Sequence, residues 1–390
     1  MAIPLTYNLR SVSNRWVSSI VAVVGIAGAV GVFIAMMSLA NGFRAALVTA
    51  GSDRNATVLR GGATAELESA IALEQARLVG DTAGVARNGE GQPMISPEIV
   101  VVTALPKKDT GTDANVQMRG VTEMAPKVHD RFRIVAGRYF KPGIAELVVG
   151  RNANHTVRGM EIGARPRFGG QDWEVVGIFE SGGSAFDSEI WLDGNLLAEA
   201  FQRPIGLYQS ITARLESPSS FQVFKDALTS NPALTLQTEP ETVYYARQSE
   251  ALSTMIQTLG SMVAVVMGIG AIFGALNTMY SAVSARSREI ATLRALGFGQ
   301  GSVVVSFVVE SLLISLVGGL LGCLAALPVN GMAVSTLNFQ TFSHMAFAFQ
   351  VSGPILLFGI GFALLMGLFG GIFPALRAAR LPIATALREL

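Results

Sequence analysis

The chain has 390 residues, of which half are apolar and only 15% are charged, and its formal net charge at pH 7 is +1. A balance this close to neutral lacks the basic excess with which proteins bind nucleic acid, so nucleic acid is excluded as a predicted partner. The one cysteine, Cys323, excludes an intramolecular disulfide, and we interpret it as a packing residue.

A membrane-spanning helix at residues 16–40 is the first predicted element, after a cytoplasmic N-terminal segment at 1–15. The run 16–40 contains no charged residue, and about 20 apolar residues in a helix cross the roughly 30 Å of hydrocarbon in a bilayer. Ser38-Leu39-Ala40 resembles a signal-peptide cleavage site, but the apolar run is longer than the usual signal core of about 7–15 residues. We interpret the run as an uncleaved anchor.

Residues 41–254 are predicted to form one large water-exposed domain, because charges of both signs and Pro and Gly turns separate short apolar runs. Residues 41–48 continue the first span without a helix breaker, and 241–260 keep helical spacing. The first two spans are therefore expected to continue outward as a stalk.

Two strand–helix–strand patterns, separated by a strand-rich stretch at 114–193, lie inside this domain. Together they predict an α+β module that carries a β-rich insertion. The predicted helices lie at 66–79 and 219–229, and the predicted strands at 56–60, 99–102, 210–215 and 234–237.

Three further spans are predicted at 255–285, 301–329 and 351–376. The first two are longer than a bilayer requires and are expected to tilt or project, and their many glycines and alanines allow close helix packing. Buried helices of a soluble protein are the alternative, which the length of the apolar runs disfavours. The predicted fold is an α-helical membrane protein with four transmembrane helices plus a large α+β extracytoplasmic domain.

Arginines at the ends of the spans predict the orientation, because Lys and Arg concentrate on the cytoplasmic side. The loop at 330–350 has no Lys or Arg, so it is predicted to be a short periplasmic loop. Residues 286–300 and 377–390 are predicted to be cytoplasmic, which places both termini inside a bacterial inner membrane. The arginines that support this are Arg10, Arg15, Arg286, Arg288, Arg294, Arg377, Arg380 and Arg388.

The sequence contains no recognisable nucleotide-binding, metal-binding or catalytic motif. A phosphate-binding loop ends in Gly-Lys-Ser/Thr, but none of the five lysines follows a glycine. The three histidines, His129, His155 and His344, lie far apart in the sequence, and none has a ligand partner at metal spacing. No catalytic, cofactor-binding or metal-binding residue is predicted, and the chain is not expected to be an enzyme.

Glu310 is a charged residue inside the third predicted span. Intramembrane charge often marks a proton or ion path. This glutamate lies only a few residues from the predicted cytoplasmic end, so we interpret it as an interfacial carboxylate paired with Arg286, Arg288 or Arg294.

The cytoplasmic segment 284–297 reads Ser-Ala-Arg-Ser-Arg-Glu-Ile-Ala-Thr-Leu-Arg-Ala-Leu-Gly, and the next span contains Phe307 and Glu310. Taken alone, this segment indicates a basic helix beside the membrane. The order Arg-x-Arg-Glu-Ile, Leu-Arg-Ala-Leu-Gly and then a Phe…Glu span resembles the permeases of the MacB/FtsX (type VII) ABC transporter superfamily. The stretch 373–388 looks like the closing signature of that family, and 147–150, 161–163, 175–178 and 239–245 resemble its periplasmic core domain.

The resemblance implies a porter-like α+β module with a sabre-like insertion and a short helix that docks on an ATPase. Glu310 would support that helix, and Arg377, Arg380 and Leu387 would form a C-terminal cytoplasmic contact. The residues implied in ATPase coupling are Arg286, Arg288, Glu289, Ile290, Leu293, Arg294 and Gly297.

The partners follow from the same resemblance. MacB itself carries its ATPase fused at the N-terminus, whereas this sequence starts shortly before its first span, so a separate ATPase dimer that binds the ATP is expected. A second permease copy or a sister permease would complete the membrane part within the lipid bilayer. A periplasmic membrane-fusion adaptor and an outer-membrane channel are further partners that the family allows.

The implied function is mechanotransmission, in which ATP-driven motion of the ATPase reaches the periplasmic domain through the stalk. The expected outcome is export or extraction of an amphiphilic substrate. An FtsX-like signalling scaffold that regulates envelope hydrolases is the alternative, which the size of the outer domain disfavours.

Overall fold

The computed structural model describes residues 16–338 and 341–383 and divides the chain into two compact units. We name the first the helical unit, which comprises residues 16–41, 254–332 and 349–383 of the described chain. We name the second the α+β unit, which comprises residues 42–253 and 333–348. The predictions for Arg10, Arg15, Leu387 and Arg388 lie outside the described residues.

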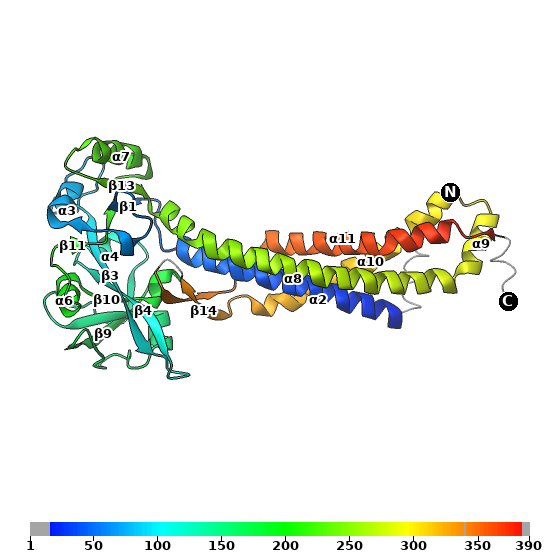
Figure 1. Ribbon diagram of the computed structural model, residues 1–390, viewed down its shortest axis with the longest axis horizontal. Coiled ribbons are helices and arrows are strands. Elements are labelled where there is room, and N and C mark those ends of the chain that lie inside the picture. Colours follow the sequence, from blue (N-terminus) through cyan, green and yellow to red (C-terminus); the bar gives the residue numbers. More distant parts are fainter. Residues whose placement is uncertain (1–15, 339–340, 384–390) are drawn as a thin grey trace. The chain divides into compact units, whose positions relative to one another are not determined.

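The helices of the helical unit include four that are long and apolar enough to cross a membrane, counted over the described part of the chain. Two of them, α2 and α8, extend beyond this unit into the α+β unit (Figure 1). The helices are α2 (Trp16–Val48), α8 (Glu241–Ala285), α9 (Ser287–Ala295), α10 (Gln300–Ala326), η4 (Leu327–Val329) and α11 (Gly353–Ala379).

Glycines let these helices approach closely. A Cβ atom on Gly322 of α10 would lie 2.8 Å from the carbonyl oxygen of Ala27 in α2, and one on Gly371 of α11 would lie 2.5 Å from Cβ of Ser311 in α10. Such distances leave no room for a larger residue. Small residues therefore decide helix packing here, as is usual where lipid removes the hydrophobic driving force between helices.

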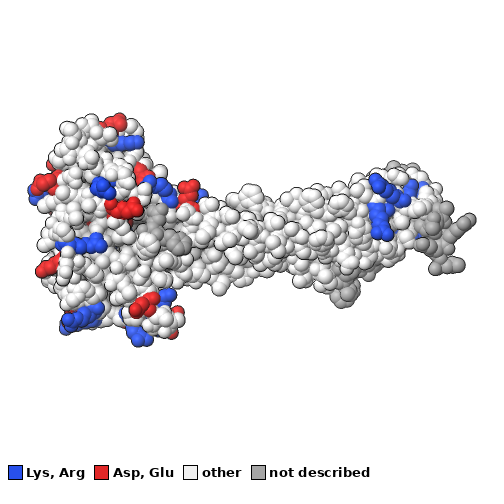
Figure 2. All heavy atoms as spheres, in the orientation of Figure 1, with Lys and Arg blue, Asp and Glu red and all other residues white. Residues whose placement is uncertain are grey.

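Charge is distributed unevenly over the surface of the helical unit. In Figure 2 most of the visible surface of this unit carries neither Lys, Arg, Asp nor Glu, and basic side chains gather near one end. The uncharged part of this surface includes exposed apolar side chains such as Val266 (70% exposed) and Leu357 (71% exposed). A surface of this kind is stable in contact with lipid hydrocarbon.

The α+β unit is built around a nine-stranded sheet in the order β13-β1-β12-β3-β4-β10-β6-β9-β5. The strands are β1 (Asn55–Arg60), β2 (Ile71–Ala72), β3 (Ile95–Pro106), β4 (Asp113–Val121), β5 (Arg133–Gly137), β6 (Glu146–Gly150), β7 (Arg167–Phe168), β8 (Gln171–Asp172), β9 (Glu174–Glu180), β10 (Ile190–Asp193), β11 (Leu207–Tyr208), β12 (Ser210–Arg214) and β13 (Leu236–Pro240).

Short helices accompany this sheet. They are η1 (Glu66–Glu68), α3 (Leu73–Gly80), α4 (Ala125–Val128), α5 (Arg151–Thr156), η2 (Ala185–Ser188), α6 (Gly194–Ala200), η3 (Pro218–Ser220) and α7 (Phe221–Ser230).

The long strand β3 joins two hydrophobic cores. Its first part, Ile95–Glu98, pairs with β12, and its second part, Ile99–Pro106, pairs with β4. One core lies on the β12 side and includes Val58, Ile211 and Phe224, whereas the other includes Met118 and Trp173. The predicted α+β module and its β-rich insertion are thus two cores on one continuous sheet.

Residues 330–350, which were predicted as a short loop, contain a β-hairpin. Strands β14 (Ala333–Asn338) and β15 (Ser343–Ala348) pair antiparallel and belong to the α+β unit. The hairpin is fixed there by hydrogen bonds from Asn115 Nδ2 to the carbonyl oxygen of Phe342 (2.9 Å) and from the Ala346 amide to Ser188 Oγ (3.0 Å).

Most predicted local elements of the α+β unit are confirmed, including the strands near 56–60 and 210–215 and the helix near 219–229. The helix predicted at 66–79 is wrong in its first half. There η1 and β2 precede α3, which begins only at Leu73, because Ile71 pairs with Tyr208 of β11 and is fully buried. A strand pairing distant in sequence overrides the helical spacing of the apolar residues.

Candidate functional site

The short helix α9 connects α8 and α10 at one end of the helical unit. It ends in a turn in which the Phe298 amide donates to the Leu293 carbonyl and the Gly297 amide donates to the Arg294 carbonyl, both at 3.1 Å. This pattern requires a residue with positive φ, and Gly297 has a φ of +98°. Gly297 therefore terminates the helix and turns the chain into α10.

Arg286 anchors the start of α9 in the bundle. Its guanidinium lies 3.0 Å from a carboxylate oxygen of Glu310 in α10 and 3.1 Å from one of Glu289, and it lies over the ring of Phe307. The side chains of Arg286 and Glu310 are 8% and 4% exposed. Among the three arginines considered as partners of Glu310, the structure thus gives Arg286.

The inward face of α9 makes two further contacts within the helical unit. Ile290 is buried in a cluster that includes Val283 of α8, Phe307 of α10 and Ala378 of α11. Arg294 Nη1 donates to the carbonyl oxygen of Leu381 at 2.8 Å, just beyond α11. Helix α9 is therefore fixed to the ends of α8, α10 and α11, so a displacement of α9 would be felt by all three.

The outward face of α9 carries exposed side chains. Arg288 and Glu289 are exposed, and Leu296, just after the helix, is 70% exposed. Arg288 forms no ion pair with the part of the chain that the structure describes. Of the predicted coupling residues, Arg286 and Ile290 point inward, Leu293 and Arg294 are half-buried, and only Arg288 and Glu289 of the helix itself are exposed.

Leu296 was not among the predicted coupling residues. The sequence pattern that could have identified Leu296 is an apolar residue directly before a glycine that ends a helix. At that position the side chain is not buried in the helical unit. A large exposed apolar side chain beside an exposed arginine is typical of a protein interaction surface.

The C-terminal residues Arg377 and Arg380 are exposed near the end of α11. The Arg377 guanidinium lies 5.6 Å from the centre of the Tyr280 ring. Both arginines line an open hollow of about 430 Å³ with Phe373 and Pro382. The third predicted residue of this contact, Leu387, lies outside the described residues.

A second candidate site, which sequence reasoning missed, is a buried charge cluster in the α+β unit. We define it as Glu66, Glu98, Arg119, His129, Glu189 and Glu241. Arg119 of β4 is 1% exposed, and its guanidinium lies 2.8 Å from Glu66, 2.6 Å from Glu98 and 2.8 Å from Glu189. These six residues come from six separate segments, so no local motif identifies them.

His129 extends the cluster, because its Nε2 lies 2.8 Å from an oxygen of Glu98. Burial disfavours the charged ring, but the charge of Glu98 and this hydrogen bond outweigh burial and raise the pKa of His129. Burial likewise disfavours the Glu98 carboxylate, but the charges of Arg119 and His129 lower its pKa to about 2. Both directions favour a charged pair at neutral pH.

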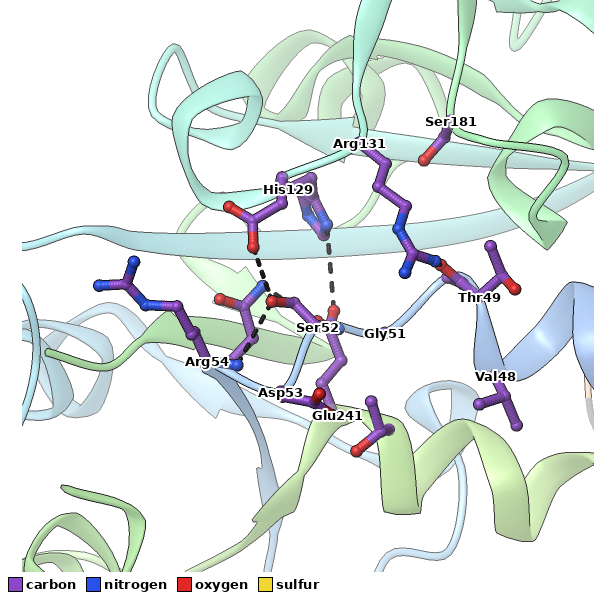
Figure 3. Close-up of a pocket in the computed structure, with 14 residues that line it drawn as sticks. Val48, Thr49, Gly51, Ser52, Asp53, Arg54, His129, Arg131, Ser181 and Glu241 are labelled. Carbon is purple, nitrogen blue, oxygen red and sulfur yellow. Dashed lines mark hydrogen bonds and ion pairs between the residues drawn. The ribbon is translucent and has the colours of Figure 1, made fainter. Parts of the chain in front are cut away.

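Glu241, the first residue of α8, joins the cluster to the segment between α2 and β1. One of its oxygens accepts hydrogen bonds of 2.9 Å from the Ser52 amide and from Asn55 Nδ2. A Cβ on Gly51 would lie 2.8 Å from the Thr242 nitrogen, so only glycine allows this approach. Figure 3 shows Glu241 and His129 facing each other beside an open pocket of about 440 Å³.

Two family profiles match the chain. The family described as MacB-like periplasmic core domain matches residues 19–231, and the family described as FtsX-like permease C-terminal matches residues 261–383. The two matches together span both units.

Individual relatives agree with these profiles. The macrolide export ATP-binding/permease protein MacB of Bordetella avium is 25% identical over 317 residues, which are 76% of this chain and 46% of the relative. The uncharacterized ABC transporter permease YknZ of Bacillus subtilis is 25% identical over 230 residues, 56% of this chain and 55% of the relative. The chain thus spans about half the length of these relatives.

Among solved structures, the periplasmic region of MacB from Actinobacillus actinomycetemcomitans matches with 10% identity and a TM-score of 0.38. The match covers 52% of this chain and 95% of that one.

Proposed function

This chain belongs to the MacB/FtsX family of ABC transporter permeases, and on that basis we propose that it transmits the ATP-driven motion of a partner ATPase to its α+β unit. The ATPase would bind the outward face of α9, which is cytoplasmic in this proposal. The α+β unit would lie in the periplasm and act there on an amphiphilic substrate, by export or by extraction from the membrane.

The observation that carries the proposal is the division of α9 into two faces. Arg286, Ile290 and Arg294 hold the helix to three neighbouring helix ends, while Arg288 and Leu296 are exposed. A helix held in this way moves together with the bundle when a partner pushes it. A flexible basic loop without these contacts would move by itself and would not transmit the motion to the bundle.

The continuous helices α2 and α8 supply the path. With 33 and 45 residues, they are about 50 and 68 Å long at roughly 1.5 Å per residue, against about 30 Å of hydrocarbon. Each therefore runs from the helical unit into the α+β unit without a break, and Glu241 ties the segment between α2 and β1 to the start of α8. A tilting motion of either helix would therefore be transmitted to the sheet of the α+β unit.

The proposed assembly contains two ATPase subunits, which bind the ATP, and two permeases. The second permease is another copy or a sister chain, and a periplasmic adaptor and an outer-membrane channel complete an export route. The match of 19–231 with the MacB-like periplasmic core domain supports export over the signalling-scaffold alternative.

The test begins with isolation of the native complex and identification of its ATPase by mass spectrometry. The double variant Arg288→Ala/Leu296→Ala should lower the stimulation of that ATPase by the permease about tenfold, because an exposed arginine and leucine at the centre of an interface commonly contribute 1.4 kcal/mol or more. The matched control is Arg158→Ala/Leu207→Ala, which removes the same side-chain types from the surface of the α+β unit.

The double variant keeps the anchors Arg286, Ile290 and Arg294, so its thermal stability should equal that of the wild type. Full ATPase stimulation and full transport in a folded double variant would refute docking on α9.

A further inference from the structure

A second cavity in the α+β unit, of about 190 Å³, is lined by none of the six residues of the buried charge cluster. Its walls are formed by the β3–β4 turn with the start of β4, the end of α5, the end of η2 and the β14–β15 hairpin. The residues that matter for its chemistry are Lys107, Ala114, Val116, His155, Val157 and His344.

Hydrogen bonds fix the walls of this cavity in place. Lys107 and Val157 form an antiparallel bridge, and the Lys108 amide donates to the Thr156 carbonyl at 2.9 Å. These bonds fasten the β3–β4 turn to α5. The hairpin wall is fastened to the sheet by the bonds of Asn115 and Ser188 described above. The cavity is therefore preformed.

The floor of the cavity is apolar, because Val116 and Val157 are each 3% exposed and Ala114 is 4% exposed. Water on such a floor forms few hydrogen bonds with the protein. Its displacement by apolar ligand groups is therefore favourable. At about 30 Å³ per water-sized group, the volume corresponds to roughly six such groups, which suits a short aliphatic chain.

The rim of the cavity is cationic at Lys107, which forms no ion pair with any described residue. Its neighbour Lys108 is paired with Glu161 at 2.6 Å. Asp109 also lines the cavity, but it is exposed, and its Oδ1 accepts the Thr110 amide within the turn. Lys107 is thus the group available to an anion at the rim.

His344 of β15 adds a buried polar atom to the cavity. Its Nδ1 has no hydrogen-bond partner among the described residues. Burial and the positive charge of Lys107 lower the pKa of His344, so the ring is neutral at pH 7. The ring also bonds the backbone of Asn115, so Nδ1 of the neutral ring is an acceptor, which is unfavourable until a water or a ligand donor reaches it.

We propose that this cavity is a binding site for a monoanionic amphiphile, with its carboxylate on Lys107 and its aliphatic chain on Val116 and Val157. As a site for transported substrate, the inference rests on the proposed function; as a binding site, it stands alone. Because one wall is the hairpin between α10 and α11, the bound ligand would also hold that hairpin against the sheet.

The test uses the full chain in nanodiscs of zwitterionic lipid, without any ATPase, and octanoate carrying a photoreactive diazirine as the probe. Labelled positions are mapped by mass spectrometry. Octanoate, octanol and octylammonium, which share an eight-carbon chain and carry an anionic, a neutral and a cationic head group, serve as competitors. Labelling should fall on 107–116, 155–157 and 344–346, and octanoate should compete about tenfold better than the other two, as a charge-assisted hydrogen bond predicts.

Lys107→Ala should weaken octanoate competition about tenfold, and Ala346→Phe should abolish it by filling the cavity. Lys225→Ala removes an exposed lysine from α7 and should change nothing. Equal competition by all three compounds, or labelling of the lipid-facing helices that Lys107→Ala leaves unchanged, would mean bilayer partition only and would overturn the proposal. Since no ATPase is present, this result is independent of docking on α9.

Discussion

Arg286 and Glu310 form a buried ion pair that links α9 to α10. Both side chains are more than nine-tenths buried, so each would be costly without the other. A pair of this kind contributes little net stability compared with apolar residues of similar size, whereas the loss of one partner leaves an uncompensated charge. We therefore interpret the pair as a device that fixes the position of α9.

Glu310→Ala should destabilise the helical unit by about 1–3 kcal/mol, because it removes a charge-assisted hydrogen bond to the buried Arg286 guanidinium, which keeps its contact with Glu289. Thermal unfolding in nanodiscs measures this loss. The double variant Arg286→Met/Glu310→Leu should recover most of the stability but not the ATPase stimulation. Glu289→Ala is the control, since that carboxylate is 60% exposed and should matter by less than about 1 kcal/mol. A double variant as unstable as Glu310→Ala would contradict this account.

His129 should make the stability of the α+β unit depend on pH. Its pKa is raised in the folded protein, so its contribution is complete below the unfolded value of about 6.5 and is lost as pH rises through the folded value. Unfolding followed by the fluorescence of Trp191, whose ring lies 5.1 Å from that of His129, should show stability falling above this value.

His129→Gln should reduce this decline and cost about 2 kcal/mol at pH 6, the typical loss of a hydrogen bond to a charged group. A smaller decline should remain, because burial raises the pKa of Glu241 to about 7 and stability also falls as pH rises toward that value. His155→Gln is the control, because His155 is exposed on α5. A decline of equal size in His129→Gln would assign the pH dependence to another group.

At the scale of elements, the β14–β15 hairpin is the least expected feature. Phe347 of β15 is 4% exposed and packs edge-to-face on the fully buried Phe43 of α2, with ring centres 5.4 Å apart. Since Phe43 and Phe347 both belong to the α+β unit, the hairpin packs on the continuation of α2 there. The short segment between α10 and α11 is thus part of the sheet domain's own packing.

Phe347→Ala should cost about 3–5 kcal/mol, the usual effect of removing a buried phenylalanine. Its effect should concentrate in the hairpin, where amide hydrogen exchange of 333–338 should become faster. Phe342→Ala is the matched control, because that ring is 59% exposed and the hydrogen bond at Phe342 involves only its carbonyl group. Unchanged exchange at 333–338 in Phe347→Ala would show that other contacts hold the hairpin.

At the scale of the whole molecule, the chain passes between the two units four times, after residues 41, 253, 332 and 348. Each of the four apolar helices is therefore connected in sequence to the α+β unit, two through continuous helices and two through the hairpin. Helices α10 and α11 contact α9 and its surroundings. Their motion can be transmitted to the sheet through the β14–β15 hairpin that connects them in sequence.

The orientation across the membrane is tested by labelling. In a Cys323→Ser background, Thr110→Cys in the β3–β4 turn should react with an impermeant maleimide once the outer membrane is permeabilised. Thr292→Cys on α9 should react only after the inner membrane is opened. Both positions are exposed, so the order of reaction reports sidedness. The reverse order would place α9 outside and exclude docking on a cytoplasmic ATPase.

Local features of this protein could be predicted from its sequence. An apolar run such as 351–376 needs no distant partner to indicate a membrane span, because its length and composition alone set the free energy of insertion. The strand at 56–60 and the basic helix before α10 follow in the same way from residues adjacent in the chain. The resemblance carried by 284–297 is local too.

Features that depend on distant contacts were decided by the tertiary structure. The sequence left three arginines as partners for Glu310, and only packing selects Arg286. Glu66 was predicted as the first residue of a helix but lies against Arg119 of β4. Residues 330–350 were predicted to be a loop, although their strands pair and the hairpin is bonded to the α+β unit. The physical reason is that a buried charge or an isolated hairpin is unstable by itself and takes its position from partners many residues away.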